Sequence, residues 1–182
     1  MLILMAAQLV LTGCSRQTVY SHYENIGTEG WERRDSVAYV VPVRKGGTFE
    51  EEVGIRSTRI YPYMNIALIV SQEAQPSGAH RQDTVYMNLT DEKGHGEGEG
   101  VSYRQLTAPV SRIQLQDGDT LRVSIRHYMH RENLPGIKDV GFSMTRADEG
   151  QSVDYLLAAL RPASIRRKIK SRSVKPHSDE PP

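Results

Sequence analysis

The sequence has a single cysteine, Cys14, among its 182 residues. One cysteine cannot close a disulfide within the chain, and without a cluster of Cys or His at fixed spacing it does not form a zinc site. Cys14 follows an apolar segment whose polar residues are Gln8 and Thr12, so no base nearby in the sequence would activate it as a nucleophile. The pattern favours a point of covalent attachment.

The sequence also lacks an apolar run of the roughly 20 residues that a membrane-spanning helix needs. Its N-terminal run, from Leu2 to Thr12, instead has the length of the apolar part of a signal peptide. The stretch LTGC, Leu11 to Cys14, resembles the bacterial lipobox. That resemblance implies that residues 1–13 are removed and that Cys14 becomes a lipidated N-terminus with three acyl chains. The alternative is an apolar N-terminal strand that frays.

Signatures of catalysis and of metal or nucleotide binding are missing as well. No Gly-x-Ser-x-Gly, His-Glu-x-x-His or Walker motif occurs. His127 and His130 would point to opposite faces of a strand, and the glycine-rich segment Gly94 to Gly100 carries two glutamates that would repel phosphate. We therefore predict no catalytic residue, no metal site and no cofactor.

Alternating apolar and polar residues dominate the middle of the chain and predict β-strands with one wet face. Six to eight such segments, separated by turns such as QPSG and QDGD, predict an all-β fold with a single antiparallel β-sandwich of the jelly-roll or immunoglobulin-like kind. In residues 47–56, Phe49, Glu51, Val53 and Ile55 share the face expected to be buried, and Glu51 is the exception to its apolar character. Residues 63–72 are the best candidate for a central strand.

The expected domain organisation has four parts. A signal peptide at 1–13 precedes a lipidated tether at 14–30, a β-sandwich at 31–145, and a tail at 146–182 with a short helix ending near Pro162. Seven of the 23 Lys and Arg residues lie between Arg161 and Lys175, so we expect the tail to be basic and disordered. Anionic lipid or an acidic protein would be its partner, whereas a lipidated protein outside the cytoplasm would not meet nucleic acid.

Three stretches, WERRDSVAYVVPV, GIRSTRIYPYMNIALIV and GIKDVGFSM, together resemble the gliding-motility lipoprotein H (GldH) family of Bacteroidetes. The resemblance covers roughly Cys14 to Met144. The matching positions are Trp31, Asp35, Arg56, Tyr61, Pro62, Tyr63, Asn65, Asp139 and Gly141.

The resemblance implies a membrane-anchored, non-enzymatic lipoprotein that is a structural or accessory component of an envelope machine for gliding or the associated protein secretion. Its partners would be the membrane, through the lipid on Cys14, and other envelope proteins. The stretch after Cys14 has no acidic run, which favours the periplasmic face of the outer membrane over export to the cell surface.

Most of the matching positions are expected to set geometry, as residues at bends and strand ends do. Exposed Tyr and Arg side chains are also favoured at protein interfaces, which gives a candidate interaction surface. Its residues are Trp31, Arg56, Tyr61, Tyr63 and Asn65.

A different class of function remains open from the sequence. A carbohydrate-binding β-sandwich lipoprotein of the outer membrane would place several aromatic rings in one exposed row. The tyrosines that test this alternative are Tyr61, Tyr63, Tyr86, Tyr103 and Tyr128.

Overall fold

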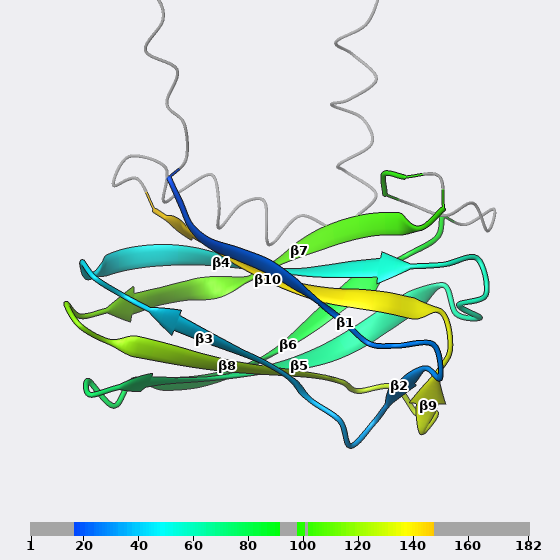
Figure 1. Cartoon of the computed structure of the whole chain (residues 1–182), viewed down its shortest axis with the longest axis horizontal. Helices are drawn as coiled ribbons and strands as arrows, with labels where there is room; N and C mark the ends of the chain where they lie inside the picture. The colour runs from blue at the N-terminus through cyan, green and yellow to red at the C-terminus, as the bar shows by residue number, and fades with distance from the viewer. Residues whose placement is uncertain (1–16, 92–97, 101, 148–182) are drawn as a thin grey trace, which may run out of the picture. The chain divides into compact units, whose positions relative to one another are not determined.

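The computed structural model describes residues 17–91, 98–100 and 102–147. Their secondary structure consists of strands: two four-stranded antiparallel sheets and a two-stranded ribbon. The two larger sheets pack face to face around one hydrophobic core (Figure 1). The predicted all-β antiparallel sandwich is thus confirmed.

The first sheet has the strand order β1-β10-β4-β7, the second has the order β3-β8-β5-β6, and β2 pairs with β9. The strands are β1 (Thr18–Asn25), β2 (Trp31–Glu32), β3 (Val37–Pro42), β4 (Gly47–Ser57), β5 (Asn65–Gln75), β6 (His80–Asn88), β7 (Arg104–Leu115), β8 (Thr120–His127), β9 (Asn133–Leu134) and β10 (Ile137–Arg146). β5 lies between β8 and β6, so residues 63–72 do contain an interior strand.

The alternation read from the sequence matches the burial of the strands because successive side chains in a strand point to opposite faces. On β8, Leu121, Val123 and Ile125 are buried, whereas Arg122 between them is exposed. On β4, the expected inner face is also buried, and it includes Glu51 with no exposed surface. Each sheet therefore turns its apolar face inward and its polar face to solvent.

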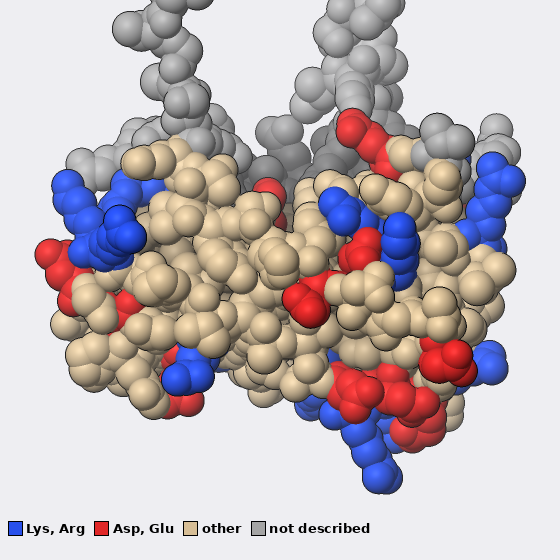
Figure 2. All heavy atoms as spheres, in the orientation of Figure 1, with Lys and Arg blue, Asp and Glu red and all other residues tan. Residues whose placement is uncertain are grey.

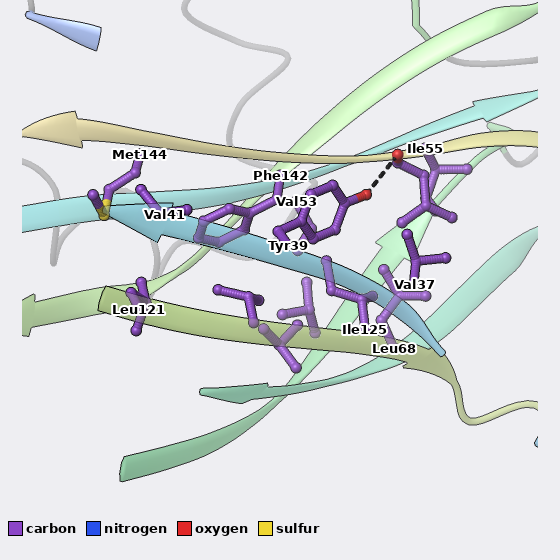
Figure 3. Packing of buried hydrophobic residues seen from close by; sticks show 14 of the residues in the cluster. Val37, Tyr39, Val41, Val53, Ile55, Leu68, Leu121, Ile125, Phe142 and Met144 are labelled. Carbon is purple, nitrogen blue, oxygen red and sulfur yellow. Dashed lines mark hydrogen bonds between the residues drawn. The ribbon is translucent and has the colours of Figure 1, made fainter. Parts of the chain in front are cut away.

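Tyr39 on β3 connects the two sheets through the core. Its ring lies 5.8 Å from that of Phe142 on β10, and its hydroxyl donates a 2.8 Å hydrogen bond to the carbonyl of Val140 (Figure 3). Burial raises the pKa of this phenol far above its ordinary value. A buried hydroxyl needs such a partner, so the bond fixes how β3 lies against β10.

The sandwich begins earlier than the sequence pattern suggested. Residues 14–30 were expected to be a tether, yet Thr18–Asn25 form β1, which pairs with β10 from Thr18↔Thr145 to Asn25↔Asp139. Tyr20 also packs edge-on against Tyr39 at 6.3 Å. β1 has few apolar residues, so its place depends on backbone pairing along β10 more than on a hydrophobic face.

The strand register shows which residues lie at each of the two ends of the sandwich. At one end lie Trp31, the end of β4 at Ser57 and the start of β5 at Asn65; we call it the Trp31 end. At the other lie the start of β1, the end of β10 and the turn at 43–46 between β3 and β4; we call it the Lys45 end. In Figure 1 the Trp31 end is at the right and the Lys45 end at the left.

Several sequence-based expectations lie outside the described residues. These are the signal peptide, the lipidation of Cys14, the helix ending near Pro162 and the basic tail. The described residues include no helix that is long and apolar enough to cross a membrane.

Candidate interaction surface

The predicted interaction residues come together at the Trp31 end. Trp31 begins β2, Arg56 lies one residue before the end of β4, and Asn65 begins β5. Tyr61 and Tyr63 lie in the connection between β4 and β5. In an antiparallel sheet, the end of one strand lies beside the start of its neighbour, so residues far apart in the sequence meet at this end of the sandwich.

Trp31 supports this end from inside. Its side chain is 1% exposed and its indole Nε1 donates to the carbonyl of Asp35 at 3.2 Å, the partner that a buried indole requires. The ring of His127 packs edge-on against it at 5.3 Å, and burial lowers the pKa of that imidazole. Trp31 was named among the candidate interaction residues, but it is buried inside this end and offers no surface for a partner.

Tyr61 and Tyr63 form an edge-to-face pair with ring centroids 5.7 Å apart. The Tyr61 hydroxyl donates to the carbonyl of Asn65 at 2.8 Å, and burial raises the pKa of Tyr61 well above its usual range. Gly136 has a φ of +84° and lies against the backbone of Tyr61, where an added Cβ would come within 2.4 Å of its nitrogen. Only glycine fits this contact, so the connection from β4 to β5 is held in one place.

Arg56 joins the four strands of the first sheet. Its Nε donates to Oε1 of Gln105 on β7 at 2.8 Å, and its Nη1 lies 3.5 Å from Oδ2 of Asp139 on β10. Asn25 on β1 also donates to Asp139, at 2.9 Å. The Arg56 side chain is 27% exposed, so part of its guanidinium remains open to solvent while the rest ties the strands together.

Tyr23 completes the cluster and was not identified from the sequence. The Arg56 guanidinium carbon lies 3.9 Å from the centroid of the Tyr23 ring. The ring covers Gly141 and Gly54, which pair with each other across β10 and β4, and a Cβ on either would collide with it. Glycine inside a strand often marks such a close approach, so Gly54 and Gly141 were the available signal.

Apolar side chains are exposed around the same end. Of the six exposed large hydrophobic side chains among the described residues, four lie there: Ile60 at 70%, Met64 at 52%, Tyr86 at 75% and Tyr128 at 60%. Tyr86 pairs with Ala67 across the strands, and the backbone nitrogen of Tyr128 donates to the carbonyl of Ala67. Single exposed hydrophobic residues are ordinary, whereas exposed patches of them are typical of contact surfaces, so these four residues are candidates for one.

The five tyrosines named for the carbohydrate-binding alternative do not form one row. Tyr61 and Tyr63 are partly buried against each other, whereas Tyr86 and Tyr128 are exposed beside the second sheet. Tyr103 lies beside the first sheet, with the ammonium of Lys138 4.5 Å from its ring centroid. This distribution over two sheets does not favour a sugar-binding groove. In the described part of the chain, no group of three or more His, Cys, Asp or Glu side chains could hold a metal ion.

Comparison with known proteins gives a match in sequence. The family model described as GldH lipoprotein matches residues 18–144. The gliding motility lipoprotein GldH of Flavobacterium johnsoniae is 27% identical over 157 residues, which cover 80% of this chain and 96% of that protein. The match begins at Thr18, the first residue of β1, and ends two residues before the end of β10.

The similarity to solved structures is weak. The globular domain of zebrafish complement 1qA has a TM-score of 0.41 and 10% identity, covering 74% of this chain and 98% of that one. A family 35 carbohydrate binding module from Clostridium thermocellum has a TM-score of 0.37 and 11% identity, covering 70% of this chain and 95% of that one. These scores are too low to support a statement about fold or function.

Proposed function

The chain belongs to the GldH lipoprotein family, and we propose that it is a lipid-anchored protein of the cell envelope that serves gliding motility or the associated protein secretion. The observation that carries the proposal is the family match, which spans nearly the whole sandwich. Its role is structural or accessory and not enzymatic. It faces the periplasm from the outer membrane.

The anchor is the lipid on Cys14, which LTGC specifies and which precedes the sandwich directly. Three acyl chains hold a protein to a bilayer on any biological timescale, since even two lipid signals give stable anchoring. Expressed with its own signal, the protein should incorporate labelled palmitate and partition to membranes, and Cys14→Ala should abolish both. A soluble, unlabelled wild type would contradict the anchor.

Other envelope proteins contact the Trp31 end. This end lies opposite the start of β1, so an anchor before β1 leaves it accessible. It presents Ile60, Met64, Tyr86 and Tyr128 for apolar contact, with the partly exposed guanidinium of Arg56 on the adjoining sheet. Aromatic and arginine side chains around an apolar centre are the usual composition of interface hot spots.

Deletion and complementation in the native bacterium test this role. Loss of the gene should reduce protein secretion to the medium and, where the organism glides, colony spreading. The double variant Met64→Glu with Tyr86→Glu should fail to restore these properties although it reaches the membrane. Val40→Glu is the matched control because Val40 is 51% exposed on β3, outside the Trp31 end. A deletion that alters neither property would contradict the proposed function.

The basic segment from Arg161 to Lys175 is a separate proposal. Its seven cations would add contacts with anionic lipid or with an acidic protein face. A peptide of residues 161–175 should bind protein-free anionic vesicles if lipid is the partner, and the absence of binding would favour an acidic protein face.

A further inference from the structure

The chain enters and leaves the sandwich at the Lys45 end. The backbone nitrogen of Arg146 donates to the carbonyl of Gln17 at 3.0 Å, and that of Ala147 donates to Thr48 at the start of β4. Cys14 precedes Thr18 by four positions, a segment that spans roughly 14 Å at most. An acyl chain on Cys14 would therefore bring this end to the bilayer surface.

A hollow of about 470 Å³ opens at this end between the start of β1 and the end of β3. Its lining includes Val19 and Pro42 together with the cations Arg44, Lys45 and Arg146. Val19 is 38% exposed, and Arg44 and Lys45 are exposed at the tip of the turn. In Figure 2, basic side chains gather at the left of the view, over this turn. Apolar side chains beside cations are typical of surfaces that lie on membranes.

Arg146 holds the turn in a fixed shape. Its Nη1 donates to the carbonyl of Gly46 at 2.9 Å and its Nη2 to that of Lys45 at 2.8 Å, while its guanidinium carbon lies 4.8 Å from the ring centroid of Phe49. These bonds engage both terminal nitrogens of Arg146, so Arg146 holds the turn in place. Arg44 and Lys45 are exposed and line the hollow, so they are the cations available to an anion there.

Asp117 and Asp119 lie near these cations, and both carboxylates are engaged within the fold. Asp117 accepts a hydrogen bond from the backbone nitrogen of Gly46 at 2.7 Å. Asp119 is buried and accepts from the backbone nitrogens of Gln116 and Ser77 at 2.8 and 3.0 Å. Neither lines the hollow, so both help to shape the end without occupying the place of a ligand.

We propose that the Lys45 end is a docking surface for anionic phospholipid headgroups, with Arg44 and Lys45 contacting lipid phosphate and Val19 and Pro42 facing the interface. The proposal rests on the proposed lipidation of Cys14 and adds an orientation to it: the sandwich stands on the membrane with its Trp31 end outward. Each cation held within a Debye length of an anionic surface strengthens the association about fivefold, so the two exposed cations together contribute roughly 25-fold.

The test uses the full lipidated protein in two kinds of vesicle, one of phosphatidylcholine and one of phosphatidylcholine with phosphatidylglycerol, both carrying a nitroxide on some headgroups. Since lipidation blocks the Cys14 thiol, an introduced cysteine can be labelled alone with a fluorophore. Gln116→Cys places the label at the Lys45 end outside the hollow, and Met64→Cys places it at the Trp31 end. The variant of interest is Arg44→Glu with Lys45→Glu. Arg59→Glu with Arg131→Glu is the charge-matched control at the Trp31 end.

The expected result is strong quenching at position 116 in the anionic vesicles and weak quenching at position 64. Arg44→Glu with Lys45→Glu should lower the ratio of docked to undocked protein at least about 25-fold, whereas the control should leave it unchanged. Equal quenching at the two positions, or quenching that ignores Arg44 and Lys45, would overturn docking while leaving the anchor intact. Purified protein without acyl chains would contradict the proposed function itself and remove the basis for docking.

Discussion

Replacing Glu51 with glutamine is expected to stabilise the protein above neutral pH and to leave its stability unchanged in mild acid. Glu51 lies between the sheets with no exposed surface, and its Oε2 accepts hydrogen bonds from Gln72 at 2.7 Å and from Ser111 at 2.9 Å. Burial raises the pKa of this carboxyl to about 7. A glutamine oxygen can accept the same two bonds without carrying a charge.

The size of the effect follows from the difference between folded and unfolded pKa values. The unfolded carboxyl titrates near 4.5 and the folded one near 7, so the folded state holds the proton more tightly. The favourable contribution of Glu51 is therefore complete below the unfolded pKa and is lost as the pH rises through the folded pKa. At about 1.4 kcal/mol per pKa unit, the loss for a buried group is about 3 kcal/mol.

Urea unfolding followed by circular dichroism measures this difference. Wild type and Glu51→Gln should have similar free energies of unfolding at about pH 4, and the variant should be more stable by about 3 kcal/mol at about pH 8.5. Glu73→Gln, which removes an exposed carboxylate on β5, should follow wild type at both pH values. The same gap at both pH values, or a less stable Glu51→Gln at high pH, would refute the reasoning.

Three further substitutions test the packing. Arg56→Ala removes the contacts with Gln105, Asp139 and Tyr23 and should lower the free energy of unfolding by about 2–4 kcal/mol in a urea titration. Its control, Arg59→Ala at an exposed position, should lower it by less than about 0.5 kcal/mol. Gly141→Ala places a Cβ 2.5 Å from the Tyr23 ring and should lower the free energy of unfolding by about 1–3 kcal/mol. The loss should be smaller when Tyr23 is also replaced by alanine, and an equal loss in both backgrounds would exclude the contact. Tyr39→Phe removes the hydroxyl that donates to the carbonyl of Val140 and should lower the free energy of unfolding by about 0.5–1.5 kcal/mol. An unchanged unfolding midpoint would contradict a stabilising role for that bond.

The sequence predicts the inner strands well because burial on one face imposes a period of two. β8 shows this directly: Leu121, Val123 and Ile125 alternate with polar residues in the sequence and are buried in the structure. The buried face of β4 was identified correctly even though it includes Glu51, because the alternation of side chains along the strand places position 51 in the interior.

The edge strand and the side-chain cluster could not be predicted in the same way. β1 carries Ser21, His22 and Glu24 and shows no apolar periodicity, and its pairing with β10 joins residues that are far apart in the chain. The contact of Arg56 with Tyr23 depends on the registers of β1 with β10 and of β10 with β4, which no local pattern encodes. Of the residues predicted for an interaction surface, Trp31 is buried, whereas Met64, which the sequence did not single out, is exposed at the same end.

The most direct test of the account is mass spectrometry of the mature N-terminus of the protein purified from its native envelope. The account predicts a chain that begins at Cys14, with a diacylglyceryl group on the sulfur and an acyl group on the new amino terminus. A chain that keeps residues 1–13 and carries a free thiol at Cys14 would contradict it.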